Sequence, residues 1–412
     1  MPVLAPFAVR SFRFQWPADL FTSWAFEMEN LILGWYVLSA TGSVESLVVL
    51  GALVWLGSIF SPVFGVAGDR LGFRFLLCAT RAAYAVLALV IATLAWTKAL
   101  EPWHVFTVAA LAGLMRPQDN VMRYVLVGQT MRQGLLMPAL GIQRTTSDTA
   151  RIAGALAGTG GVALIGMAPA YVIVTAMYVG AFLLSLGVAG PPARAEGDAQ
   201  QAAARALAGL RQAVGYVWQQ PDQLGAFSMA FLVNLLAFPF FLGLLPYVAK
   251  DVYAIGQAGL GYLAASFAVG AFAGSVVLGA GRTPMRAGRA MLAAAAVWFV
   301  AILLFGQSRL LPWGLPLLFV CGFAQSLCMT PLAAVMLRAA SDEMRGRVMG
   351  IRMLAIWGLP LGLLASGPII ARLGYSATTL LYAAGGLVAT VAIGTRWRAA
   401  LWERSAPANS RF

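Results

Sequence analysis

Residues 152–193 read IAGALAGTGGVALIGMAPAYVIVTAMYVGAFLLSLGVAGPPA and contain no Asp, Glu, Lys or Arg. A helix that crosses a membrane needs about 20 mostly apolar residues. This stretch is long enough for the end of one membrane span and the whole of the next, with a turn near Gly166–Pro169. It therefore predicts a protein that crosses the membrane more than once.

The composition of the whole chain agrees with this prediction. Of its 412 residues, 60% are hydrophobic and 10% are charged, whereas a soluble domain has about 25% charged residues. So little polar surface excludes an ordinary soluble enzyme and a disordered chain. The net charge of +13 is spread thinly between apolar runs. We therefore read it as anchoring at the cytoplasmic membrane surface, with no nucleic-acid partner.

Twelve membrane spans are predicted when a few internal charges are allowed. They lie near 18–41, 45–67, 74–96, 102–125, 139–166, 169–190, 223–249, 257–281, 287–307, 313–337, 347–371 and 375–396. The segments assigned to the cytoplasm carry eighteen arginines, and the outside loops carry only Lys98, Lys250, Arg309 and Arg372. Basic residues are retained on the cytoplasmic side of a membrane. We therefore expect a multi-pass protein of the inner or plasma membrane with both termini cytoplasmic.

The chain divides into two halves that resemble each other. The apolar pattern is broken at 191–222, where apolar residues at helical spacing predict an amphipathic helix in a cytoplasmic linker. The predicted domains are a six-helix half at 1–190, this linker at 191–222, and a six-helix half with a cytoplasmic tail at 223–412. At an offset of 209, Gly113-Leu114 matches Gly322-Phe323. Such repeats, with a binding site between them, are typical of secondary transporters.

The loop between spans two and three carries a motif. Residues 65–74 read GVAGDRLGFR, which resembles the major facilitator superfamily signature G-x-x-x-D-R-x-G-R-R/K. The matching positions are Gly65, Asp69, Arg70, Gly72 and Arg74, and Phe73 departs from the pattern. The resemblance implies the all-α fold of that family, with twelve transmembrane helices in two six-helix halves. It also implies that these five residues form a conformational latch.

Two further segments resemble one branch of that family, which contains enterobactin exporters and macrolide-efflux proteins. They are LGWYVL at 33–38, followed by TGS at 41–43, and EMRGRVMG at 343–350. The chain departs from the drug antiporters at two places. Thr159 stands where their glycine-rich stretch in span five has a proline, and Asp119-Asn120 replaces the Gln-Gly that follows the arginine of span four. The branch resemblance implies export, and its motifs mark a branch and not a substrate.

Ionisable residues lie inside several predicted spans of the first half, where they are costly and usually functional or paired. They are Glu27 and Glu29 in span one, Arg116, Asp119 and Arg123 in span four, and Arg144, Asp148 and Arg151 in span five. These charges sum to zero, which favours structural ion pairs for Arg123, Arg144, Asp148 and Arg151. The candidates for proton coupling are Glu27, Glu29 and Asp119. Because Glu27 and Glu29 are two residues apart on a helix, they point about 200° apart and cannot both face one cavity.

A few polar and aromatic residues sit on spans that would line a central cavity. The candidates for substrate contact are Arg116, Asn234, Phe238, Gln325 and Met329, and simple helix packing is the alternative interpretation. The three cysteines lie in apolar runs, so neither a disulfide framework nor a metal site is predicted. The chain also has no Gly-Lys-Ser/Thr nucleotide-binding loop.

The leading hypothesis from the sequence is a secondary active transporter, not an enzyme, that exports a small amphipathic compound such as a drug or a siderophore-like metabolite in exchange for protons. The first alternative is an importer of a small polar or anionic nutrient, with Arg116 holding a carboxylate. The second is a non-transporting membrane receptor on a transporter scaffold. We expect a monomer without a cofactor or a metal. Its partners would be a small-molecule substrate, protons and the lipid bilayer.

Overall fold

The computed structural model describes residues 4–60, 71–190, 214–279, 286–338, 352 and 354–402, and all regular structure in these residues is helical. In the first half the α-helices are α1 (Arg10–Thr41), α2 (Val44–Leu53), α4 (Phe73–Trp96), α5 (Pro102–Thr130), α6 (Gln133–Ile165) and α7 (Met167–Ser185). Two 3-10 helices, Ala5–Ala8 and Leu56–Phe60, complete it. The predicted amphipathic helix of the linker falls mostly at 191–213, outside the described residues.

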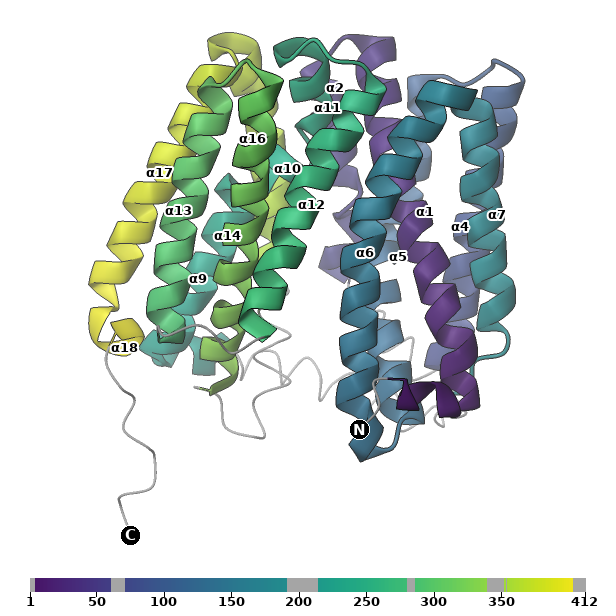
Figure 1. Cartoon of the computed structure of the whole chain (residues 1–412), viewed down its shortest axis with the longest axis horizontal. Coiled ribbons are helices and arrows are strands. Elements are labelled where there is room, and N and C mark those ends of the chain that lie inside the picture. The colour runs from purple at the N-terminus through teal and green to yellow at the C-terminus, as the bar shows by residue number, and fades with distance from the viewer. Residues whose placement is uncertain are drawn as a thin grey trace. The chain divides into compact units, whose positions relative to one another are not determined.

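The second half is also helical in its described residues (Figure 1). Its α-helices are α9 (Pro221–Leu236), α10 (Pro239–Leu242), α11 (Leu245–Tyr247), α12 (Gln257–Gly279), α13 (Ala287–Gln307), α14 (Leu311–Arg338), α16 (Gly358–Leu373), α17 (Tyr375–Arg396) and α18 (Arg398–Trp402). A π-helical turn at Val248–Val252 follows α11, and a 3-10 helix at Ala355–Trp357 precedes α16. The all-α membrane fold predicted from the sequence is confirmed.

Six helical segments of the described residues are long and apolar enough to cross a membrane. They are Phe73–Trp96, Met167–Ser185, Gln257–Gly279, Ala287–Gln307, Leu311–Met336 and Ala355–Arg396, of which the last contains both α16 and α17. Helices α1, α5 and α6 are as long, and they carry the ionisable residues of the first half.

Two of the helix-to-helix turns have nearly the same backbone in the two halves of the chain. Gly166, between α6 and α7, has φ 85° and ψ 170°, and Gly374, between α16 and α17, has φ 82° and ψ 166°. Glycine adopts positive φ without the steric cost that a side chain brings. The turn predicted near Gly166 is confirmed, and its counterpart supports the internal repeat.

The span predicted at 223–249 is not one continuous helix. Helix α9 ends at Leu236, and the chain continues as α10, α11 and the π-helical turn. Pro239 and Pro246 explain the breaks, because proline has no N–H to donate and disfavours helical backbone at the residue before it. Helix α1 is longer than the span predicted at 18–41, because it begins at Arg10 and continues through Pro17.

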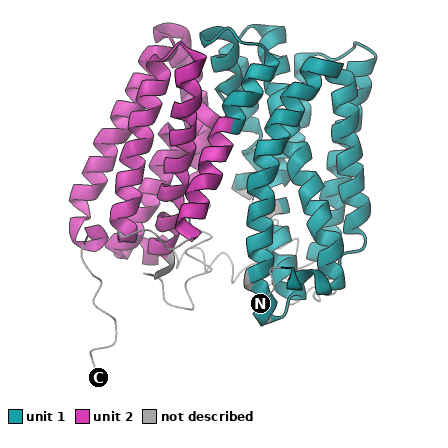
Figure 2. Ribbon diagram, viewed as in Figure 1, with its two compact units in different colours: residues 1–206, 243–265 teal, residues 207–242, 266–412 magenta. Residues whose placement is uncertain are grey.

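The described structure forms two compact units (Figure 2). The first unit contains residues 1–206 and 243–265, and the second contains residues 207–242 and 266–412. Residues 243–265 therefore pack with the first half of the chain. In that unit the Lys250 ammonium donates a hydrogen bond to the carbonyl of Leu38, with 3.1 Å between the two atoms. Leu38 lies in the last turn of α1, where the helix dipole favours a cation.

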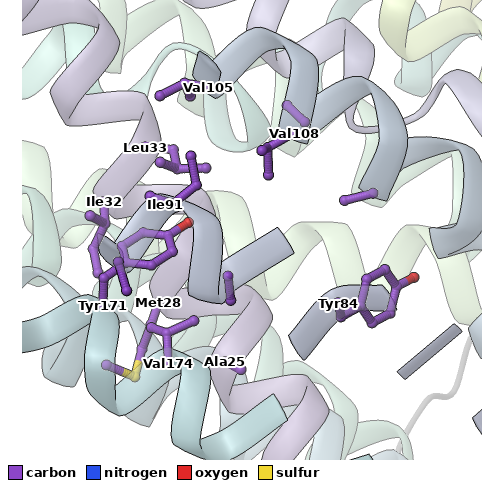
Figure 3. Close-up of a cluster of buried hydrophobic side chains, with 14 of the residues drawn as sticks. Ala25, Met28, Ile32, Leu33, Tyr84, Ile91, Val105, Val108, Tyr171 and Val174 are labelled. Atoms are coloured by element: carbon purple, nitrogen blue, oxygen red, sulfur yellow. The ribbon is translucent and has the colours of Figure 1, made fainter. Parts of the chain in front are cut away.

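Helix α1 is in contact with several other helices of the first unit. It packs against α2, α5, α6 and α7, and α4 packs along α7. The apolar core between these helices includes Ile32, Tyr84, Ile91, Tyr171 and Val174 (Figure 3). Because α1 touches so many neighbours, its polar side chains meet those of several other helices inside the unit.

Equivalent glycines allow two helices to approach closely in each unit. A Cβ atom added to Gly113 of α5 would lie 2.0 Å from the carbonyl oxygen of Leu53, and one added to Gly322 of α14 would lie 1.9 Å from that of Phe267. The two glycines are the pair matched by the offset of 209 in the sequence. Small residues at such contacts are typical of helix packing in membranes.

Replacing Gly113 with alanine is expected to lower the midpoint of thermal unfolding in detergent. The methyl group would collide with backbone, and overpacking of this kind costs about 1–3 kcal/mol. Gly128→Ala on the same helix is the matched control, because nothing lies within 4 Å of the added Cβ atom there. The control should keep or raise the midpoint, since alanine favours a helix by about 1 kcal/mol. Equal midpoints for the two variants would contradict the close approach.

Candidate functional site

A cavity of about 160 Å³ lies in the first unit, among α1, α4, α5 and α6. It is lined by Thr22, Ser23, Phe26, Glu27, Trp55, Tyr84, Arg116, Asp119, Arg123, Ser147 and Arg151. Helix α1 supplies four of the lining residues and α5 supplies three. Eight charged residues were predicted within spans of the first half. Five of them line the cavity, and a sixth, Glu29, pairs with the lining residue Arg116.

Glu27 and Arg151 form a loose ion pair at the cavity. The Glu27 carboxylate oxygen and the Arg151 Nε atom are 3.7 Å apart, and the two side chains are 22% and 32% exposed. Helix α6 can approach α1 here because Gly154 faces Glu27, where a Cβ atom would lie 2.7 Å from the Cβ of Glu27. This pair joins α1 to α6, and of the ion pairs at the cavity it is the one most accessible to solvent.

Asp119 belongs to a buried cluster of four charges. Arg123 pairs with Asp119 one helical turn away, and Arg81 of α4 lies 3.5 Å from the same carboxylate. Arg81 also pairs with Asp19 of α1, which is 3.6 Å from Arg123. The two arginines and two aspartates sum to zero charge. We call these four residues the buried cluster.

Polar side chains form hydrogen bonds with three members of the buried cluster. Arg81, which is fully buried, donates to the Ser185 hydroxyl at 2.5 Å, and Gln143 donates to Asp19 at 2.9 Å. The Ser23 hydroxyl accepts a bond from Arg123 at 3.0 Å. The buried cluster and its hydrogen-bond partners thus connect α1, α4, α5, α6 and α7.

Asp19 and Arg81 were not among the candidates named from the sequence. Both nevertheless lie inside predicted spans, at 18–41 and 74–96. Charges in spans are costly, and that signal would have identified both. What the sequence could not show is that they are partners, because 62 residues separate them.

Glu29 faces away from the charged cavity and is held by three donors. The hydroxyls of Tyr171 and Tyr178 donate to its carboxylate at 2.9 and 2.8 Å, and Arg116 does so at 3.3 Å. Glu29 is 7% exposed. The Arg116 guanidinium lies over the ring of Phe26, 3.2 Å from its centroid, a contact that stabilises a cation. Glu29 therefore fixes Arg116 in the wall of the cavity.

The remaining pair of span five lies within α6. Arg144 and Asp148 are one turn apart, with 3.2 Å between Nε and the carboxylate oxygen. Asp148 is buried, whereas the Arg144 side chain is 58% exposed. Neither residue lines the cavity.

Only two of the five latch residues can be described. Gly72 has φ 85° and precedes α4, and Arg74 donates to the carbonyl of Leu186 at 2.7 Å. Gly65, Asp69 and Arg70 lie outside the described residues. The contact of Arg74 joins the first turn of α4 to the end of α7.

The candidates in the second half belong to the second unit. Asn234 donates to the carbonyl of Ala230 in its own helix at 2.8 Å, and the ring of Phe238 packs edge-on against Trp298 at 5.1 Å between centroids. Gln325 and Met329 are half-buried on α14. The side-chain oxygen of Gln325 is buried without a hydrogen-bond partner in the described part of the chain.

Metal coordination finds no support in the residues described. Within 4–60, 71–190, 214–279 and the later described ranges, no three His, Cys, Asp or Glu side chains are grouped so that they would hold a metal ion. The chemistry that the cavity offers is that of arginines, carboxylates, hydroxyls and aromatic rings.

Comparison with known proteins gives a family and a fold. The family model described as Major Facilitator Superfamily matches residues 16–365. Curated protein sequences gave no match. Among solved structures, the POT family transporter PepTSo has a TM-score of 0.75 at 14% identity and covers 96% of this chain and 99% of its own. The nucleoside transporter NupG has a TM-score of 0.73 at 13% identity and covers 95% and 100%. At such identities the likeness concerns the fold alone.

Proposed function

This chain belongs to the major facilitator superfamily, and we propose that it exports a small amphipathic compound in exchange for protons, by alternating access. Membership of this family makes it a membrane transporter and not an enzyme. The observation that supports exchange with protons is the Glu27–Arg151 pair at the charged cavity.

The three candidate carboxylates differ in how they are held. Asp119 pairs with two buried arginines, and Glu29 accepts bonds from two tyrosines and an arginine. Protonating either one would break a buried network, which is costly. Glu27 has a single arginine at 3.7 Å and faces the cavity. A proton carrier must bind and release a proton in each transport cycle. Glu27 is therefore the carboxylate that suits proton coupling, and Asp119 and Glu29 have structural roles.

The cavity has the lining that a small amphipathic ligand requires. Phe26, Trp55 and Tyr84 give it aromatic surface, and its arginines and carboxylates give it charge. The export direction rests on the resemblance of residues 33–43 and 343–350 to the exporter branch.

A second function, import of an anionic nutrient together with protons, is favoured by the charges of the lining. Three arginines and two carboxylates line the cavity. When Glu27 binds a proton, Arg151 loses the carboxylate that neutralises it and becomes available to an anion. Proton and anion would then enter together instead of in exchange.

Vesicles containing the purified protein separate the two functions. The test compounds are naphthalenes that carry a sulfonate, a sulfonamide or a trimethylammonium group, and the membrane potential is clamped with potassium and valinomycin. Exchange with protons accumulates a compound in vesicles with an acidic interior, whichever way the protein is inserted. Joint transport accumulates it in vesicles with an alkaline interior. We expect accumulation in the acidic vesicles, and accumulation of none of the three in either vesicle contradicts both functions.

A further inference from the structure

Three exposed arginines surround one tryptophan at an end of the second unit. Trp402 is the last residue of α18. The guanidinium carbons of Arg289 and Arg398 lie 5.3 and 5.5 Å from the centre of its ring, and Arg286 donates a hydrogen bond to its carbonyl at 2.9 Å. All three arginines are exposed. We call these four residues the basic patch.

The basic patch is held together by the packing of α18. This short helix lies against α13 and α17 (Figure 1). Leu401 is 4% exposed, and a Cβ atom added to Gly288 of α13 would lie 2.3 Å from the carbonyl oxygen of Leu401. The next residue, Trp402, is 37% exposed. The fold thus brings together arginines from segments more than 100 residues apart and leaves them open to a partner.

The basic patch lies where two membrane spans end. Helix α13 and the segment Ala355–Arg396, which contains α17, are long and apolar enough to cross a membrane. Arg286 directly precedes α13, Arg289 is in its first turn, and Arg398 follows the end of α17. The patch is therefore at one membrane surface, on the side that the distribution of basic residues predicts to be cytoplasmic.

The charges of the basic patch are not neutralised by the chain. In the part of the chain that the structure describes, no carboxylate lies within 4.0 Å of its arginines. Residues 282–289 and 396–404 together contain six arginines and a single acidic residue, Glu403. Pairing of that one carboxylate would still leave five positive charges in excess. Cations gathered round one ring repel each other, and an anion bound among them relieves that repulsion.

The position and the residue types of the basic patch indicate the chemistry of that anion. The planar guanidinium group matches the oxygens of a phosphate and can donate two parallel hydrogen bonds to it. Tryptophan is enriched at the level of the lipid headgroups, where its ring is in apolar surroundings and its N–H meets water. Clusters of arginine next to a membrane span attract anionic lipids. A soluble anion would make no use of the tryptophan.

We propose that the basic patch binds the headgroup of an anionic phospholipid in the leaflet that it faces. Arg289 and Arg398 bind the phosphate, and the ring of Trp402 packs beside the glycerol part of the lipid. Arg286 contributes a third positive charge and fixes α18 through the carbonyl of Trp402. This lipid site is separate from the charged cavity, which is in the other unit, and it does not depend on the proposed transport function.

Binding of lipids to the purified full-length protein in detergent tests this site. The probe is dioleoylphosphatidylglycerol, which has a net negative charge, and its binding is measured by native mass spectrometry. Dioleoylphosphatidylcholine has the same chains and a phosphate but no net charge. We expect the anionic lipid to bind at least about tenfold more tightly. Glycerol 3-phosphate, which has the phosphate without the chains, should not displace it up to millimolar concentration.

A double variant locates the lipid at the basic patch. Arg289→Gln with Arg398→Gln should weaken dioleoylphosphatidylglycerol at least about tenfold and leave dioleoylphosphatidylcholine unchanged. Neither side chain makes a hydrogen bond within the described residues, so the fold should survive. Arg10→Gln with Arg132→Gln is the matched control. It removes two exposed arginines from the predicted cytoplasmic side of the first unit and should keep the affinity of the wild type.

Four outcomes would overturn the proposal. They are equal binding of the two lipids, an unchanged affinity for the anionic lipid in the folded double variant, an equal loss in the control variant, and displacement of the lipid by glycerol 3-phosphate. An equal loss in the control would mean that the net charge of the protein attracts the lipid, and displacement would mean that the patch binds a soluble anion. If the double variant does not fold, Arg398→Gln alone should weaken the anionic lipid severalfold, and a wild-type affinity there is equally decisive against the site.

Discussion

Replacing Arg81 with methionine is expected to prevent the accumulation of folded protein in the membrane. Arg81 is fully buried and is within salt-bridge distance of both aspartates of the buried cluster. Its removal leaves two buried carboxylates facing one arginine. Removing one partner of a buried ion pair costs about 3–5 kcal/mol, which is a large part of the stability of a typical protein.

The measurement is the yield of monodisperse protein in detergent and its midpoint of thermal unfolding. Arg13→Met is the control, because Arg13 is an exposed arginine of α1. The double variant Arg81→Met with Asp119→Asn restores neutrality and should recover part of the yield. A single Arg81→Met variant with the midpoint of the wild type would show that the buried cluster does not hold these helices together.

Glu27→Gln is expected to abolish accumulation driven by a pH gradient while substrate exchange continues. The change removes the group that carries the proton and keeps its size. Arg151 remains, and because its side chain is 32% exposed it can be solvated without a partner. The fold should therefore survive, and downhill exchange needs no proton.

Asp119→Asn is the matched comparison and should behave differently. In this variant Arg81 and Arg123 share a single aspartate, Asp19. Thermal stability, substrate exchange and accumulation driven by the pH gradient should therefore all fall together. Both fluxes are measured in the same vesicles for Glu27→Gln, Glu29→Gln and Asp119→Asn. If Glu27→Gln retains the driven flux of the wild type, Glu27 is not the proton carrier.

The fold was predictable where apolar runs end at charges or glycines. The span predicted at 287–307 coincides with α13 and the one at 375–396 with α17. The prediction failed at 223–249, because length and hydropathy ignore the two prolines that break the backbone. It also placed the start of α1 too late, because a helix continues beyond the apolar run when nothing ends it.

The charged residues of the site were predictable from the sequence, but their pairing was predictable only where the partners are near in the sequence. The spacing of Asp119 and Arg123 places them one turn apart, and the same holds for Arg144 and Asp148. The partner of Glu27 is on another helix, 124 residues away. Such pairs depend on which helices pack together, and a pattern within one helix has no information about that.

The buried cluster also restricts how this protein can evolve. Each of its four positions touches a charge of opposite sign, so the first substitution that removes a charge leaves a deficit inside the membrane. A lineage can pass through that step only if a second substitution restores the balance soon afterwards. Among descendants of a common ancestor, an acidic position and a basic position of the buried cluster should thus be lost or exchanged together. The positions of the looser pair, Glu27 and Arg151, are free to change one at a time, so adaptation to new substrates would begin there.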